Sequence, residues 1–198
     1  MTRRTVLWLA LLGVAAVVVG AVLAQALTPS SVPLGSGTWL PQPAPLPAFH
    51  LTDMGGRDFD LQSLRGHPTL LFFGFTHCPD VCPATLAALA QVQRSAPLPG
   101  SRTVFITLDP ARDSAAVLRV YLDAFSPRFL GVRGSPAALA PLLANLHVVA
   151  TREDLPGGGY TMDHSATLYL IDTHARLAAV FSPPLAPADL SADLRRIA

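Results

Sequence analysis

The hydrophobic pattern of the chain begins with a long apolar run near the N-terminus. Residues 5–24 contain no charged side chain and are mostly apolar. In a helix, about 20 such residues at a rise of about 1.5 Å each match the hydrocarbon core of a bilayer, which is about 30 Å thick. Residues 1–27 are therefore predicted to form one transmembrane helix, with a cleaved signal peptide as the alternative.

The charges around this run predict its orientation. Arg3 and Arg4 precede it, and the next arginine is Arg57. By the positive-inside rule, the N-terminus lies in the cytoplasm. We therefore expect a single-pass protein of the bacterial cytoplasmic membrane, with its domain on the outer (periplasmic or extracytoplasmic) side. Ala-Gln-Ala at 24–26 fits a signal-peptidase site and the two arginines fit a twin-arginine signal, so cleavage stays open.

Residues 28–47 are rich in Pro, Ser and Gly and are predicted to be a partly extended linker. Packing of Trp39 and Leu40 on the following domain is the alternative. Residues 48–198 alternate apolar runs with stretches of helical periodicity, which is typical of one α/β domain. A hairpin is predicted at 48–59, around a Gly-Gly turn.

The same pattern locates the remaining elements. In the helix at 114–125, the face with Val117, Val120, Tyr121 and Ala124 is expected to be buried, and Asp113 is expected to cap the helix. The order predicts a thioredoxin-like fold, with a central, mixed and mainly parallel sheet flanked by helices. Strands are predicted at 68–75, 102–109, 128–134, 147–151, 165–172 and 176–182, and helices at 84–96, 114–125, 136–146 and 186–198.

The composition narrows the possible functions. The formal net charge is +1, and 14% of the residues are charged. Nucleic-acid-binding proteins usually carry a basic surplus, so we expect no nucleic-acid partner. Cys78 and Cys82 are the only cysteines, which are too few and too close together for a disulfide framework. They indicate a functional site.

Cys78 and Cys82 lie between the first buried strand and the first long helix, where open α/β sheets place their ligands. A helix N-terminus favours a thiolate. Pro79 and Pro83 each suit a first helical turn, so either is a possible helix start. The pair fits a structural disulfide, a redox dithiol or two thiolate ligands for a soft metal, and the last role requires at least one more ligand.

His164 is the strongest candidate for that further ligand. It precedes a buried strand and follows a glycine-rich segment, and in a thioredoxin-like fold this turn, which normally holds a proline, faces the active-site helix. Asp163 is expected either to orient the imidazole or to cap a turn. His77 and Asp80 lie beside the cysteines and are weaker candidates for support of the metal. Two sulfurs and one nitrogen suit one copper ion per chain, as Cu(I) or Cu(II).

Three segments in this order resemble the Sco/SenC family, whose members are membrane-anchored copper chaperones of cytochrome c oxidase assembly. The resemblance covers about residues 46–198. The matching segments are FFGFTHCPDVCPATL at 72–86, ITLDPARDSAAVLRVYLDAF at 106–125 and DHSATLYLID at 163–172.

The resemblance implies a thioredoxin-like domain that holds copper through Cys78, Cys82 and His164. It implies delivery of this copper to the CuA-bearing subunit of cytochrome c oxidase, with other periplasmic copper carriers or thiol reductants as further partners. The alternative is a thiol–disulfide reductase that keeps the CuA-site cysteines reduced, for which Cys78 and Cys82 are the redox pair. His164 separates the two, because a reductase does not need it.

Overall fold

The computed structural model describes residue 8 and residues 12–20, 34–95 and 98–197. The chain divides into two compact units, Met1–Ser31 and Val32–Ala198. Residues 12–20 are helical, and most of the transmembrane segment predicted for residues 1–27 lies outside the described residues. None of the helices in the described ranges has the length and apolar character needed to span a membrane.

The described part of the second unit forms an eight-stranded mixed sheet of order β1-β10-β9-β4-β5-β6-β2-β3. In its centre, β4 (Thr69–Gly74) pairs in parallel with β5 (Arg102–Thr107), and β5 pairs in parallel with β6 (Leu130–Arg133). The five other ladders of this sheet are antiparallel. The mixed sheet is confirmed, but the prediction that it is mainly parallel is wrong, because antiparallel strands flank the parallel centre on both sides. These strands are β1 (Gly37–Pro45), β2 (Leu51–Asp53), β3 (Asp58–Phe59), β9 (Leu168–Ile171) and β10 (Arg176–Phe181).

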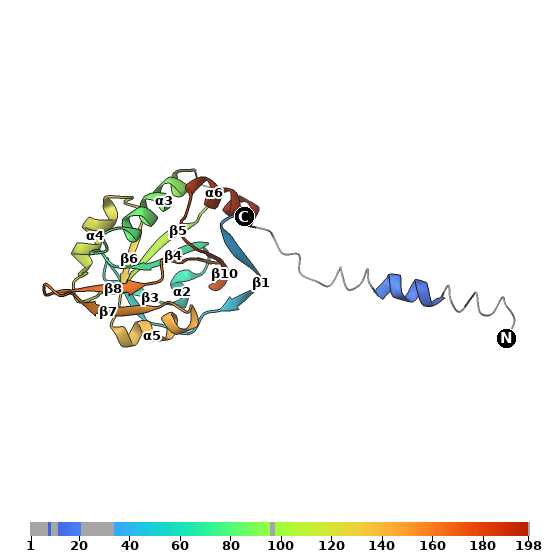
Figure 1. The fold of residues 1–198 in the computed structure, drawn as a ribbon, viewed down its shortest axis with the longest axis horizontal. Coiled ribbons are helices and arrows are strands. Elements are labelled where there is room, and N and C mark those ends of the chain that lie inside the picture. The colour runs from blue at the N-terminus through green and yellow to red at the C-terminus, as the bar shows by residue number, and fades with distance from the viewer. Residues whose placement is uncertain (1–7, 9–11, 21–33, 96–97, 198) are drawn as a thin grey trace. The chain divides into compact units, whose positions relative to one another are not determined.

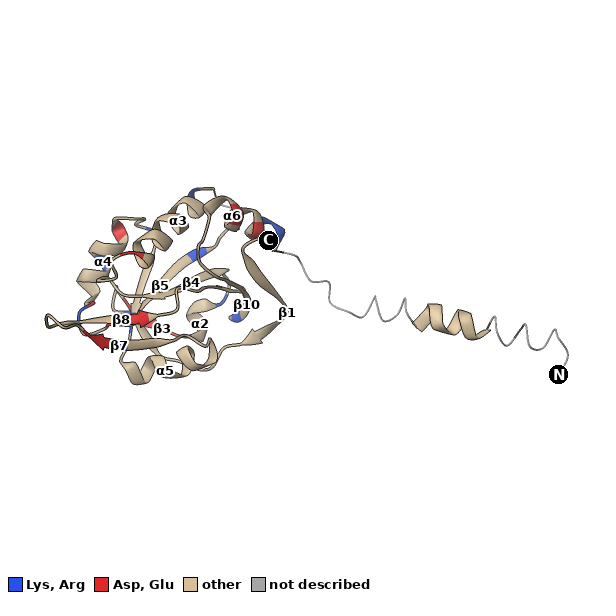
Figure 2. Cartoon of the chain, in the orientation of Figure 1, with Lys and Arg blue, Asp and Glu red and all other residues tan. Residues whose placement is uncertain are grey.

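Helices cover both faces of this sheet (Figure 1). Side chains of β4 alternate between the two layers, because Leu70 and Phe72 belong to one apolar cluster and Leu71 and Phe73 to the other. Charged residues are few and interspersed (Figure 2), so burial of apolar side chains is the main source of stability. The first cluster includes residues of α3 (Val81–Ser95), α4 (Ala115–Asp123) and α6 (Pro187–Arg196), and the second includes residues of α2 (Leu61–Leu64) and α5 (Pro136–Asn145).

Strand β1 lies in the segment that was expected to be a linker. It pairs with β10 at the edge of the sheet, and Trp39 packs against the first apolar cluster. Just before the strand, the backbone N–H groups of Gly35 and Ser36 each donate to the Asp193 carboxylate of α6 at 2.8 Å. The linker prediction is therefore wrong for these residues, because prolines are compatible with an edge strand that needs few backbone donors.

Helix α4 differs from its prediction in both its cap and its buried face. Ser114, rather than Asp113, is the N-cap. Leu118 and Leu122 are fully buried, whereas Val120 is 75% exposed. The buried stripe therefore follows the two leucines, which are one helical turn apart.

Strands β7 (Ala150–Asp154) and β8 (Tyr160–His164) pair with each other in a separate two-stranded sheet of the described chain. Residues 150–164 are called the His164 hairpin below. The sequence predicted a strand over 147–151 but no strand in the glycine-rich segment before His164. The structure therefore adds β8, which places His164 at the end of a strand.

Candidate metal centre

The cysteine segment connects β4 to α3. Because α3 begins at Val81, Cys78 lies in the connecting loop and Cys82 lies in the first turn of the helix. Cys82 is fully buried, Cys78 is partly exposed, and both thiols are free. The backbone N–H of Cys82 donates to the Cys78 sulfur at 3.4 Å. The N-terminus of α3 therefore faces that sulfur.

Two residues fix the position of this segment. A Cβ atom at Gly74 would lie 2.7 Å from the Cys82 sulfur, so only glycine leaves room for the sulfur beside β4. At the start of the loop, the backbone N–H of Thr76 donates to the Asp113 carboxylate at 3.1 Å, and the Thr76 hydroxyl donates to it at 2.6 Å. Asp113 is fully buried. It therefore ties the cysteine loop to the segment that follows β5.

His164 reaches the cysteines from the other side of the site. Its Nε2 lies 3.3 Å from the Cys82 sulfur, and its Nδ1 lies 3.1 Å from the carbonyl oxygen of Ser165. A carbonyl only accepts hydrogen bonds, so Nδ1 carries the proton and Nε2 directs its lone pair at the sulfur. The Phe75 ring meets the imidazole edge-on, with 5.7 Å between ring centroids. The His164 imidazole is therefore oriented to bind a metal ion through Nε2.

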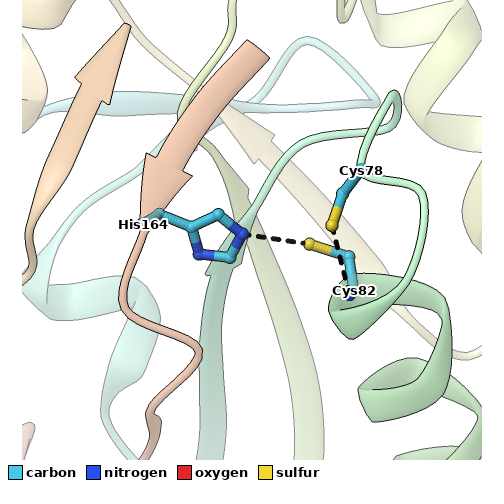
Figure 3. Close-up of side chains that lie close together, drawn as sticks. All are labelled: Cys78, Cys82 and His164. Atoms are coloured by element: carbon cyan, nitrogen blue, oxygen red, sulfur yellow. Dashed lines mark hydrogen bonds between the residues drawn. The ribbon is translucent and has the colours of Figure 1, made fainter. Parts of the chain in front are cut away.

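Cys78, Cys82 and His164 thus converge on one point (Figure 3). Their ligand atoms all lie within 4.8 Å of one another, and they are the one such group found among the described residues. Metal–sulfur and metal–nitrogen bonds of about 2.0–2.3 Å separate two ligands of one ion by at most about 4.6 Å. The three side chains therefore fit a single soft metal ion after a small adjustment.

Burial sets the protonation states of the site. It raises the pKa of the Cys82 thiol far above its usual range and lowers the pKa of the His164 imidazole. Both side chains are therefore neutral in the metal-free site near neutral pH. A metal ion that binds here displaces the thiol proton, and its charge offsets the cost of burying the thiolate.

The three supporting candidates lie outside this cluster. Asp163, His77 and Asp80 are exposed, and Nδ1 of His77 lies 3.1 Å from the Thr76 hydroxyl. Neighbouring residues of a strand point to opposite faces, so Asp163 points away from the face that carries His164. The partner of Nδ1 is instead the Ser165 backbone. Every residue has a backbone carbonyl, so the sequence contains no signal that predicts this contact.

Comparison with known proteins agrees with this fold. A family model described as SCO1/SenC matches residues 41–198. A SCO2-like protein of Rickettsia felis is 34% identical over 152 residues, which are 72% of this chain and 71% of that protein. A mitochondrial SCO2 homolog of Danio rerio is 37% identical over 132 residues, which are 63% of this chain and 46% of that protein. The chain therefore spans about half the length of that relative.

Solved structures agree with the sequence matches. The structure of Bradyrhizobium japonicum ScoI with copper bound is 39% identical and has a TM-score of 0.69, covering 77% of this chain and 99% of that one. A thiol:disulfide interchange protein of the thioredoxin family from Chlorobium tepidum is 20% identical and has a TM-score of 0.56, covering 79% of this chain and 97% of that one. The second match concerns the fold alone, and it confirms the predicted thioredoxin-like architecture.

Proposed function

The chain belongs to the SCO1/SenC family, and from this premise we propose that it is a copper metallochaperone. It binds one copper ion, as Cu(I) or Cu(II), through Cys78, Cys82 and His164. It delivers this ion to the CuA centre of cytochrome c oxidase during assembly. The observation that carries the proposal is the convergence of two thiol sulfurs and one imidazole nitrogen from separate segments to within 4.8 Å.

The chemistry of these donors supports copper as the cargo. Thiolates are soft ligands that prefer Cu(I), zinc or iron–sulfur clusters, and a Cys2His set with few ligands suits copper. A related protein, Bradyrhizobium japonicum ScoI, has been solved with copper bound. The sulfurs and the Nε2 lone pair of the present chain are donors that copper accepts.

The different burial of the ligands supports transfer by stepwise ligand exchange. Cys82 is fully buried, whereas Cys78 and His164 are partly exposed. Copper therefore enters and leaves past Cys78 and His164, while the Cys82 sulfur forms the closed end of the site. Binding releases the proton of the Cys82 thiol, and uptake of a proton by the vacated sulfur assists release.

We also propose that residues 1–27 anchor the protein in the cytoplasmic membrane, with the domain on the outer side. The uncharged run at 5–24 and the preceding Arg3 and Arg4 support this placement. An anchor would keep the copper site near the membrane-bound oxidase. Other periplasmic copper carriers or thiol reductants are proposed to load copper or reduce the cysteines.

A thiol–disulfide reductase that keeps the CuA-site cysteines reduced is the second candidate. It is favoured by the free, partly exposed Cys78 sulfur at the N-terminus of α3, with Cys82 beside it. In this reaction the Cys78 thiolate attacks the client disulfide, and the Cys82 thiolate resolves the mixed disulfide. Two electrons and two protons pass to the client, and a Cys78–Cys82 disulfide forms.

Transfer to a CuA fragment distinguishes the two functions. The copper-loaded, full-length chain in detergent is mixed with a reduced, metal-free CuA-bearing fragment, and CuA formation is followed by its absorption. We expect stoichiometric loss of copper from the chain and appearance of CuA. In a parallel experiment, the reduced, copper-free chain is mixed with the oxidised fragment, and free thiols are counted.

The His164→Ala variant is the matched control. It should bind copper about 10- to 100-fold more weakly, and therefore carry less copper to the fragment, while keeping thiol–disulfide exchange, because the exchange uses only the cysteines. Wild-type copper affinity and transfer in this variant would contradict the Cys2His site. Rapid reduction of the oxidised fragment without any copper transfer would favour the reductase.

A further inference from the structure

The His164 hairpin is weakly embedded in the domain. Its strands pair with each other and not with the main sheet, and residues 151–159 are all exposed. At its base, Ala150 and Met162 pack against the second apolar cluster, and the backbone N–H of Ser165 donates to Val149. These contacts are few for a segment that carries a proposed metal ligand, so other interactions must fix its position.

Tyr160 supplies such interactions at the first residue of β8. Side chains two and four residues apart in a strand share a face, so Tyr160 and His164 both point toward the domain. The Tyr160 hydroxyl donates to the Asp109 carboxylate at 2.8 Å, and the Tyr160 carbonyl accepts from Nη1 of Arg112 at 2.9 Å. The guanidinium carbons of Arg112 and Arg152 lie 3.7 and 3.9 Å from the centre of the Tyr160 ring. These four residues are called the Tyr160 cluster below.

The cluster is fixed to the main sheet through the segment that follows β5. Asp109 is 3% exposed and forms an ion pair with Arg112. The backbone N–H of Asp109 donates to the Thr107 hydroxyl at 2.9 Å. The aspartate is therefore a rigid acceptor for the Tyr160 hydroxyl, and it is supplied by an element that does not belong to the hairpin.

Arg112 also reaches the metal centre. Its guanidinium lies 5.9 Å from the centre of the Phe75 ring, and this ring is the one that meets the His164 imidazole edge-on. The Nη2 atom of Arg112 is buried without a hydrogen-bond partner. The guanidinium is therefore placed by its contacts with two aromatic rings rather than by complete hydrogen bonding. One of these rings lies on the hairpin and the other lies beside the imidazole.

We propose that Arg112 and Tyr160 are positioning residues that hold the His164 hairpin with its imidazole facing Cys82, and that they thereby set the rate at which copper leaves the site. This inference rests on the copper function proposed above. When the Tyr160 contacts are broken, the hairpin moves away from the domain and His164 leaves the ion. Cys78 and Cys82 then hold copper alone, with a position open to an incoming ligand.

The kinetics of copper release test this role. The full-length, reduced, Cu(I)-loaded chain in detergent is mixed with a chromogenic Cu(I) chelator. We expect Tyr160→Ala and Arg112→Lys to release copper about tenfold faster, a change typical of residues that orient a ligand. Tyr160→Phe keeps the ring contacts and should have a smaller effect. Thr161→Ala, on the opposite face of the same strand, should release copper at the wild-type rate.

A double-mutant cycle shows whether the effect passes through His164. Tyr160→Ala should add nothing to His164→Ala, and the Cu(II) electron paramagnetic resonance spectrum of Tyr160→Ala should shift toward that of His164→Ala. Thiol–disulfide exchange should stay unchanged in every variant. A full additional acceleration in the double variant, or wild-type release from both Tyr160→Ala and Arg112→Lys, would overturn the proposal.

Hydrogen exchange of the metal-free chain separates this proposal from the copper function. Tyr160→Ala should accelerate the amides of the His164 hairpin about tenfold while those of β4 keep their protection. If Tyr160→Ala loses protection everywhere, Arg112→Lys and Tyr160→Phe provide the same comparison in a folded chain. Unchanged hairpin exchange in these variants contradicts the positioning role. A wild-type chain that binds no copper contradicts the copper function instead.

Discussion

The two segments that meet at the metal centre are built in opposite ways. Cys82 lies in the first turn of a helix packed on the sheet, and its side chain is fully buried. His164 ends a two-stranded hairpin whose outer residues are exposed and whose strands do not join the main sheet. The sulfur is therefore held by the core of the domain, whereas the hairpin that carries the imidazole is attached to the domain by only a few contacts.

This difference suits a protein that must both hold an ion and release it. A ligand fixed by the core is preorganised, so little freedom is lost when the metal binds. A ligand on a detachable hairpin can leave without unfolding the domain, because regions of low local stability open separately from the core. The rigid segment therefore provides affinity, and the hairpin provides a route for exchange.

Removing one ligand from each segment should give the largest effects. Cys82→Ser replaces a soft sulfur with a hard hydroxyl in a closed position. We expect copper affinity to fall by more than about 100-fold, beyond the range of about 10- to 100-fold typical of changes around the ligands. His164→Ala opens a partly exposed position that water or buffer can fill, so we expect a smaller loss, within that range. Competition titrations with a Cu(I) chelator measure both.

The order of these two losses is the informative result. A variant such as Thr161→Ala, which changes the hairpin but no donor atom, should bind like the wild-type chain. If His164→Ala loses more affinity than Cys82→Ser, the hairpin is the dominant holder of copper, and the contrast between the two segments is wrong.

Glycine substitutions test the rigidity of each segment. Gly74→Ala places a methyl group 2.7 Å from the Cys82 sulfur and 2.9 Å from the Phe105 ring. Overpacking of this kind should lower the free energy of unfolding by about 1–3 kcal/mol and displace the sulfur, which weakens copper binding. Gly157, in the hairpin turn, has nothing within 4 Å of an added Cβ and no left-handed backbone. Gly157→Ala should change stability by less than about 0.5 kcal/mol.

Urea unfolding of the metal-free variants, followed by copper titration, measures both effects. Equal stabilities for Gly74→Ala and Gly157→Ala would show that a methyl group is accommodated beside the Cys82 sulfur as easily as in the hairpin turn. The rigid character assigned to the cysteine segment would then be wrong.

The sequence predicts the buried cysteine segment better than the exposed His164 hairpin. Continuous apolar runs located β4 and β5, because strands covered on both faces contain few polar residues. Cys78 and Cys82 were placed correctly after β4 for the same reason. The sequence did not decide where the helix after β4 begins, because Pro79 and Pro83 fit a first turn equally well.

The parts that were missed depend on contacts between distant segments. The proline-rich sequence of β1 is typical of a linker, and its pairing with the distant strand β10 produces no pattern in the local sequence. The contacts of Tyr160 with Asp109 and Arg112 join residues about fifty positions apart. His164 was identified from its place before a strand, but the groups that orient it are a backbone carbonyl and an aromatic ring. Neither the carbonyl nor the aromatic ring is a polar side chain that could be recognised beside His164 in the sequence.

Acid should weaken the hairpin before it weakens the core, and this is the smallest of the expected effects. Burial alone would raise the pKa of Asp109, but hydrogen bonds from Arg112 and Tyr160 outweigh it and hold this pKa below its usual value. A lowered pKa contributes stability above the unfolded value of about 3.9, and this stability is lost as the pH falls through the folded value. Below about pH 4, we therefore expect hairpin amides to exchange a few-fold faster, after correction for intrinsic rates, while β4 stays protected.

Asp109→Asn separates this titration from general acid unfolding. An asparagine accepts a hydrogen bond from Tyr160 but carries no charge at any pH, so its hairpin should exchange at a corrected rate that does not change between pH 5 and pH 3. The same acid response in this variant would mean that another carboxylate controls the hairpin. Parallel loss of protection in β4 and the hairpin of the wild-type chain would mean that the two segments open together. Their different attachment to the domain would then have no consequence for copper exchange.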